Sequence, residues 1–130
     1  MNYEDMKAQM QVLREQMQKQ ARVYFKEGCN KLFEKHPELD GFNWTEYTPY
    51  FNDGDTCEFS ANTDYPDIIV DGVEYGDYGE SLGDKEHELQ KSVIKFLSIF
   101  DNDDLLNMFG DHVKVFVTRD DVKVEDYEHD

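Results

Sequence analysis

The sequence predicts an α+β protein, in which a long N-terminal helix and a second helix pack on an antiparallel sheet of hairpins. Three observations lead to this fold class. Apolar residues recur every three or four positions over residues 3–35 and 84–100, as they do on one face of a helix. Short runs rich in β-branched and aromatic residues lie between and after these segments, bounded by turn residues. The chain has 130 residues, a length that favours a single hydrophobic core.

The first predicted helix covers residues 3–35. The pair His36-Pro37 ends it, because the residue before a proline is driven away from helical angles. A helix of this length is roughly 50 Å long, whereas a compact domain of the remaining residues is only roughly 35 Å across. We therefore expect residues 1–36 to form an amphipathic helix that projects in part from an acidic α+β body, residues 37–130, within one domain overall.

The first half of this helix carries a narrow apolar stripe made of Met6, Met10, Leu13 and Met17. A narrow stripe flanked by Gln, Arg and Lys is typical of a helix–helix seam. We therefore predict a homodimer formed through these four residues. Three alternatives stay open: the helix packs along the sheet, its first ten residues fray, or Gly28 kinks it back onto the body.

Two hairpins are predicted to follow. Residues 42–51 and 56–62 flank a turn at 52–55, and Pro49 cannot donate to a sheet, so the first strand ends near Tyr47 or lies at an edge there. Residues 68–70 and 73–75 flank Asp71-Gly72, a pair suited to a type I′ turn.

The remaining elements are a helix over residues 84–100, a short helix over 105–109 and a last hairpin. Residues 101–104 interrupt the helical pattern and cap the short helix, which Gly110 ends. The strands of the last hairpin cover residues 112–118 and 122–127, with a turn at 119–121.

The net charge of −17 is distributed unevenly along the chain. Residues 1–36 carry seven bases and five acids, a net +2, while residues 37–130 carry six bases and 25 acids, a net −19. Thirteen acids and no lysine or arginine occur over residues 37–84. Such a surface repels nucleic acid and attracts basic partners or divalent cations, although a purely solubilising role is an equal alternative.

Composition also limits the cellular setting. No run of about 18 apolar residues exists, and residues 1–20 lack the apolar region of a signal peptide. We therefore expect a soluble cytoplasmic protein that binds neither membranes nor nucleic acid directly. Cys29 and Cys57 have no metal-ligand spacing, which predicts two buried free thiols.

The sequence contains short matches to catalytic and metal-binding motifs, but the surrounding residues do not support any of them. Residues 79–83 match G-x-S-x-G, but the 47 residues after them are too few for the parallel sheet and the downstream acid and histidine that this nucleophile motif needs. The acidic runs at 52–55 and 101–104 lack the later ligands of an EF-hand loop, and the four histidines lack zinc spacing. We predict no catalytic residue, no dedicated metal site and no cofactor.

The most distinctive segment lies between residues 44 and 59, where aromatic and acidic residues alternate. Its aromatic residues form either the core face of the first hairpin or an acid-rimmed patch that binds a basic protein groove. On the second interpretation the interaction residues are Trp44, Glu46, Tyr47, Tyr50, Asp53, Asp55, Glu58, Asp64 and Asp67.

The same segment carries a resemblance. The run Trp44-Thr-Glu-Tyr-Thr-Pro-Tyr-Phe-Asn-Asp-Gly-Asp55, with Cys57 and Phe59 after it and the ending Gly110-Asp-His-Val-Lys-Val, Thr118-Arg-Asp, resembles a group of small uncharacterised proteins of bacteria and their phages. The resemblance covers about two-thirds of the chain from near Phe25. It implies a bacterial or phage origin and no catalytic residue.

These observations favour a non-enzymatic acidic protein that binds a basic protein partner. One concrete form is a phage-encoded inhibitor that mimics nucleic acid on a host enzyme, with carboxylates in place of phosphates. Two alternatives are a small enzyme dependent on carboxylates or a divalent cation, and a structural or assembly protein that dimerises through the N-terminal helix.

Overall fold

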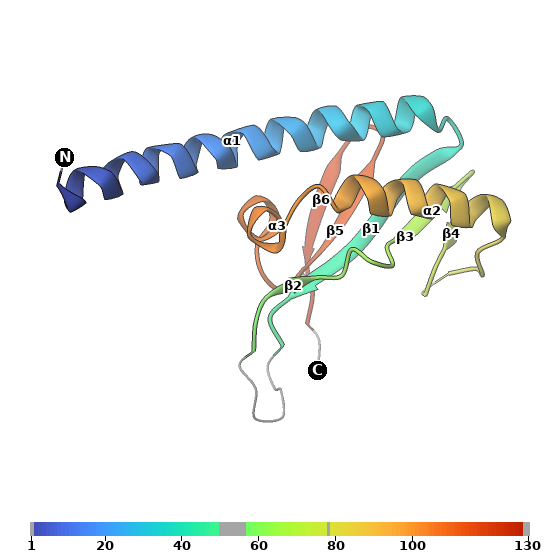
Figure 1. Ribbon diagram of the computed structural model, residues 1–130. Coiled ribbons are helices and arrows are strands. Elements are labelled where there is room, and N and C mark those ends of the chain that lie inside the picture. Colours follow the sequence, from blue (N-terminus) through green and yellow to red (C-terminus); the bar gives the residue numbers. More distant parts are fainter. Residues whose placement is uncertain (1, 50–56, 78, 129–130) are drawn as a thin grey trace.

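The computed structural model describes residues 2–49, 57–77 and 79–128 of the chain. Within them it contains three helices and six strands, drawn in Figure 1. The elements in chain order are α1 (Tyr3–Lys35), β1 (Leu39–Tyr47), β2 (Ser60–Ala61), β3 (Asp67–Val70), β4 (Val73–Tyr75), α2 (Asp84–Leu97), α3 (Asn102–Phe109), β5 (Val113–Thr118) and β6 (Val122–Asp126).

The strands form one antiparallel sheet in the order β4-β3-β1-β5-β6, with β2 paired to the end of β1. β1 is the central strand. It pairs with β5 along one edge, and along the other edge it pairs first with β3 and then with β2. The predicted α+β fold, with a long helix and a second helix on a sheet of hairpins, is confirmed.

The helices pack on one face of this sheet and bury the core. Trp44 of β1 contacts the rings of Phe25 in α1 and Phe109 in α3, with centroids 6.3 and 5.6 Å apart. The ring of Phe96 in α2 also contacts the ring of Phe25, with centroids 5.5 Å apart. Residues 113, 115 and 117 of β5 are buried on this face, while residues 114 and 116 point to the opposite face and are half-buried. No helix of the described residues covers that opposite face.

Helix α1 is uninterrupted from Tyr3 to Lys35, so the kink considered at Gly28 is wrong. Its buried residues lie in its second half, and its first half extends beyond the rest of the molecule in Figure 1. We call residues 3–20 the arm. Gly28 is needed for packing, because a Cβ atom there would collide with the ring of Phe96. Glycine therefore lets α2 approach α1 closely.

Local signals set several boundaries as predicted. Asp71 and Gly72 have φ angles of 50° and 81°, as a type I′ turn between β3 and β4 requires. Gly110 ends α3 with a φ of 97°.

Other boundaries differ from the prediction. β1 begins at Leu39, three residues early, because the turn-like Asp40-Gly41 stays extended and Asp40 accepts a 2.7 Å hydrogen bond from the backbone of Gly72. The strand predicted over residues 56–62 is limited to Ser60–Ala61 among the described residues, and the backbone N–H of Ala61 donates to Asn102 Oδ1 at 3.3 Å. The turn predicted at 52–55 lies outside the described residues.

The last two helices divide differently as well. α2 ends at Leu97, three residues early, because residues 99 and 100 switch to hydrogen bonds three positions back. α3 begins at Asn102 because Asp101 and Asp104 form a capping box, in which each side chain accepts from the other's backbone N–H.

The two cysteines are free, as expected, but only Cys29 is buried and Cys57 is half-buried. Burial raises the pKa of the Cys29 thiol to about 12, which makes it a poor nucleophile. Among the described residues, no helix has an apolar stretch long enough to cross a membrane.

Candidate functional site

The structure separates the predicted interaction residues into buried and exposed groups. Trp44 and Glu46 are 3% and 0% exposed, so the expectation that they belong to an exposed patch is wrong. Both alternate with Phe42 on the helix-covered face of β1, where the Trp44 Nε1–H donates to Glu46 Oε1 at 2.9 Å. The core-face interpretation is therefore correct for Trp44, whereas the burial of Glu46 was not predicted.

Glu46 is a carboxyl group inside the core. Burial raises its pKa to about 7, outweighing the opposing hydrogen bond from Trp44, and the nearby negative charge of Asp111 raises it further. Glu46 Oε2 is buried and has no hydrogen-bond partner among the described residues. The group therefore changes protonation near neutral pH.

Asp111 lies beside Glu46 at the start of the last hairpin. Its carboxylate accepts 2.8 and 2.7 Å hydrogen bonds from the backbone N–H and the hydroxyl of Thr48. Burial acts to raise the pKa of Asp111, but the hydrogen bonds from Thr48 and His112 outweigh burial and lower the pKa. Asp111 is therefore an ionised anchor that fixes the end of β1 to β5.

Asp67 is also buried, at the first position of β3, although it was predicted to be an interaction residue. Its Oδ1 atom accepts a 3.1 Å hydrogen bond from the backbone N–H of Asp77. Gly76 is needed here, because its φ is 142° and a Cβ atom would stand in contact with the Asp67 carboxylate. The loop after β4 therefore folds directly over this aspartate.

The other predicted residues lie near the surface. Tyr47 is half-buried, on the sheet face opposite the helices, and Glu58 and Asp64 are exposed. Tyr50, Asp53 and Asp55 lie outside the described residues. Tyr47, Asp64, Asp67 and Trp44 line one pocket, whereas Glu46 does not line it.

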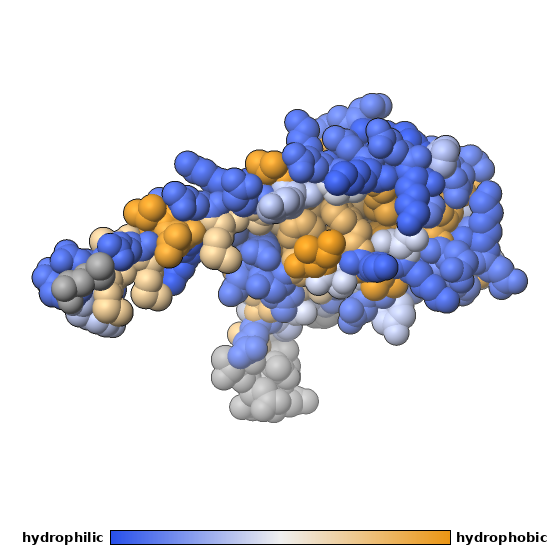
Figure 2. All heavy atoms as spheres, turned by 45° about the horizontal axis from the view of Figure 1, so that its top comes forward, coloured by the Kyte–Doolittle hydropathy of each residue, from blue (hydrophilic) through white to orange (hydrophobic). Residues whose placement is uncertain are grey.

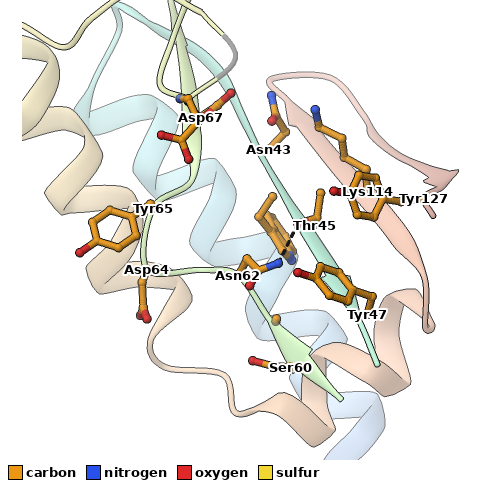
Figure 3. A pocket seen from close by; sticks show the side chains of 13 residues that line it. Asn43, Thr45, Tyr47, Ser60, Asn62, Asp64, Tyr65, Asp67, Lys114 and Tyr127 are labelled. Carbon is orange, nitrogen blue, oxygen red and sulfur yellow. Dashed lines mark hydrogen bonds between the residues drawn. The ribbon is translucent and has the colours of Figure 1, made fainter. Parts of the chain in front are cut away.

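These residues meet in a pocket of about 340 Å³, shown in Figure 3. It lies where the edge of β1 changes its partner from β3 to β2, and residues 62–66 cross beside it. We call it the acid–tyrosine pocket; its described lining residues are Asn43, Trp44, Thr45, Tyr47, Ser60, Ala61, Asn62, Asp64, Tyr65, Asp67, Asp77, Lys114 and Tyr127.

Hydrogen bonds fix the walls of the pocket. Asn62 donates from its side chain to Thr45 Oγ1 at 2.8 Å and from its backbone to Thr45 O at 2.8 Å. Asn43 donates to Glu74 Oε1 at 3.0 Å, and Gln90 of α2 donates to Pro66 O at 3.0 Å. The segment that carries Asp64 and Tyr65 is therefore held at both ends.

Acids and tyrosines give the pocket its chemistry. The described lining residues include three acids, Asp64, Asp67 and Asp77, and a single cation, Lys114, a formal balance of −2. The rings of Tyr47 and Tyr127 lie 5.8 Å apart, and Tyr65 is 77% exposed at the rim. Carboxylates beside aromatic faces bind a cationic side chain both as ion pairs and through the rings.

The sequence did not identify Tyr65, Asp77, Lys114 or Tyr127 as site residues. They reach the pocket through long-range pairing, since Lys114 is opposite Thr45 in the register of β1 and β5. Alternation places Thr45 and Tyr47 on one face of β1, but only the choice of partner strands brings distant residues to that face.

Basic residues gather in a second hollow, of about 400 Å³, between α1, α3 and the last hairpin. Their guanidinium groups already bind the backbone. Arg22 donates to Asn107 O at 3.0 Å, and Arg119 donates to the carbonyls of Phe33, His36 and Pro37 at the end of α1. These arginines stabilise the fold by satisfying carbonyl groups at the ends of helices.

The remaining motifs found in the sequence contribute no site. Ser81 is exposed in the loop before α2. In the described part of the chain, no three His, Cys, Asp or Glu side chains are grouped so that they could hold a metal ion.

The predicted oligomerisation residues Met6, Met10, Leu13 and Met17 are all exposed on the arm. Figure 2 shows apolar side chains running along the arm among hydrophilic ones.

Comparisons of the chain with known protein families, with curated proteins and with solved structures gave no match. The resemblance of residues 44–55 to small bacterial and phage proteins therefore stays a prediction.

Proposed function

We propose that this protein is a non-enzymatic acidic interaction protein that binds a basic protein surface and takes one basic side chain into the acid–tyrosine pocket. The observation that carries this proposal is the pocket itself, with its three aspartates and three tyrosines. Its volume of about 340 Å³ is at the lower end of ligand sites, so it suits one side chain better than a large cofactor.

Arginine fits this chemistry better than lysine. A guanidinium group is planar, pairs with carboxylates through two parallel hydrogen bonds and stacks on aromatic rings. Asp64 and Asp77 supply exposed carboxylates, and Tyr65 supplies an exposed ring. We therefore expect the partner to present an arginine from a basic surface.

The wider surface supports the same kind of partner. Residues 37–130 carry a net charge of −19, which accelerates the encounter with a basic protein and disfavours contact with nucleic acid. One specific form of the proposed function combines this charge with the predicted bacterial or phage origin. In it, the protein is a phage-encoded inhibitor that occupies the nucleic-acid groove of a host enzyme.

The pocket can be tested with an arginine nonapeptide as the probe. Trp44 is the only tryptophan of the chain and lines the pocket, so its fluorescence reports occupancy. We expect the peptide to change the Trp44 emission, a lysine nonapeptide to bind more weakly, and the double variant Asp64→Asn/Asp77→Asn to lose about tenfold in affinity, equivalent to roughly 1.4 kcal/mol.

A matched control separates the pocket from general charge attraction. The variant Asp71→Asn/Asp120→Asn removes the same charge from exposed positions that do not line the pocket. We expect it to bind the arginine peptide almost as well as the unmodified protein. Equal losses in the two double variants would contradict a role for the pocket.

A further inference from the structure

We infer that the arm is a dimerisation element that pairs with the arm of a second copy in antiparallel orientation. Met10 of one copy lies opposite Leu13 of the other, and Met6 lies opposite Met17. This inference rests on the arm alone and is independent of the proposed function.

The first step is the spacing of the exposed apolar residues. Beginning at Tyr3, steps of three and four residues alternate along one face of α1, the 3.5-residue repeat of a coiled coil. Its apolar members are between 47% and 72% exposed. We call this face the seam; it consists of Tyr3, Met6, Met10, Leu13, Met17, Gln20 and Tyr24.

The second step is that the body buries a different face of α1, while α3 borders the seam only across a hollow. The residues of α1 that are buried against the body are Phe25, Cys29, Leu32 and Phe33. At about 100° per residue, their centre lies roughly a third of a turn around the helix from the centre of the seam. A second helix can therefore lie along the arm without displacing α2 or the sheet.

The third step is the contact area. In this register the five apolar seam residues from Tyr3 to Met17 each expose on the order of 100 Å², so pairing two copies removes up to roughly 1,000 Å² from water, about the area expected of a specific interface. The antiparallel register with Met10 opposite Leu13 places apolar residues against each other at its centre. It also places Tyr3 against Gln20 at each end, where the two polar groups can form a hydrogen bond.

The fourth step is charge, which selects the antiparallel orientation. A hollow of about 580 Å³ separates the seam from α3, lined by Met10, Leu13, Arg14, Met17, Gln18, Asp103 and Asp104. In the antiparallel register, Lys7 of the second copy lies opposite residue 16 on the same side as Arg14. Lys7 of the second copy therefore reaches Asp103 and Asp104, so that Arg14 and this lysine together face the two aspartates.

A parallel pair lacks this match. It would place the neutral Gln9 and Gln16 of the second copy beside the aspartates, and it would bring two bodies of net charge −19 to the same end. The antiparallel pair separates the bodies and neutralises the hollow.

The oligomeric state of the full chain gives the first test. We expect light scattering after gel filtration to report twice the chain mass of 15.4 kDa. Met10→Glu and Leu13→Glu should give monomers with unchanged circular dichroism, because both positions are exposed. Val12→Glu, at an exposed position on another face of α1, should remain dimeric. A monomeric unmodified protein, or dimers that survive both seam variants, overturns the inference.

Cysteine crosslinking tests the orientation. In a Cys57→Ser background, with Cys29 buried, Met10→Cys protein is mixed with Leu13→Cys protein and oxidised. The antiparallel register predicts that the mixture forms a crosslinked dimer while neither protein alone does, because a disulfide needs closely facing positions. Crosslinking of Met10→Cys alone would show a parallel pair and overturn the orientation.

Discussion

Glu46 makes the stability of the hydrophobic core depend on pH. The side chain is fully buried, donates nothing while ionised, and keeps one oxygen without a partner among the described residues. Its position is nonetheless specific, because the Trp44 indole N–H points at its other oxygen. A buried carboxyl group of this kind favours the protonated form, so its ionisation opposes folding.

The corresponding prediction concerns the variant Glu46→Gln. The pKa of Glu46 rises from about 4.5 to about 7 on folding. Its ionisation therefore destabilises the folded state progressively as pH rises from about 4.5, and fully above about 7. Relative to the unmodified protein, Glu46→Gln should gain up to about 3 kcal/mol of unfolding free energy between pH 5 and pH 8.

Urea unfolding followed at several pH values measures this gain, within a range above the isoelectric point of about 4.4. Glu27→Gln, at an exposed position of α1, is the matched control and should show no such pH dependence. A constant difference between Glu46→Gln and the unmodified protein at all pH values would contradict the raised pKa.

Single residues also show why most of the site could not be predicted from the sequence. Phe42, Trp44 and Glu46 lie on one face of β1, but from the sequence alone an acid at such a position is equally consistent with a surface residue. Its burial depends on the Trp44 hydrogen bond and on the packing of α3, which are tertiary contacts. Asp64 and Asp67 of the pocket could be identified locally, but Asp77, Lys114 of β5 and Tyr127 after β6 could not.

At the scale of elements, the close contact of α1 and α2 depends on Gly28. Intrinsic helix propensity favours Ala over Gly by about 1 kcal/mol in a helix interior. At this position, however, the added methyl group would meet the ring of Phe96, which is itself packed against Phe25 and Phe100. A buried ring surrounded by other rings cannot move without disturbing the core.

We therefore expect Gly28→Ala to destabilise the protein by about 1–3 kcal/mol in spite of its better helix propensity. Thermal or urea unfolding measures the change. Lys31→Ala, at an exposed position one turn further along α1, should change stability by less than about 0.5 kcal/mol. An increase in stability for Gly28→Ala would mean that α2 can shift away from α1 at little cost.

Elements with strong local signals were predicted best. The periodicity of residues 3–35 identified α1, and Asp71-Gly72 identified the β3–β4 turn, because both patterns act within a few residues. The boundary of β1 was missed because Asp40-Gly41 has the composition of a turn, while pairing with β3 and β5 keeps it extended. The capping box at Asp101 was visible as an acidic run, but its reciprocal hydrogen bonds were needed to place the first residue of α3.

For the whole molecule, the uneven distribution of charge predicts opposite effects of salt on different contacts. The acidic body repels itself, so screening should raise the melting temperature as NaCl increases from about 50 to about 500 mM. Binding of an arginine peptide should weaken steeply over the same range, because it is an attraction between opposite charges.

The paired arms should behave differently, because the seam is largely apolar and burial of apolar surface persists in salt. Sedimentation should therefore report a dimer at both salt concentrations, while peptide binding measured by Trp44 fluorescence falls at the higher one. Loss of the dimer and of peptide binding together would show that one set of charges governs both, contrary to the separate surfaces described for the arm and the pocket.

The long uninterrupted α1 has one more consequence. In the antiparallel register the two copies overlap only along their arms, so the far ends of the two α1 helices stand roughly 70 Å apart at 1.5 Å per residue. In the proposed dimer, the two helices would hold two copies of the acid–tyrosine pocket at a fixed distance. A target with basic sites at a matching spacing would be bound by both pockets at once, and avidity would make even a weak single contact selective for that spacing.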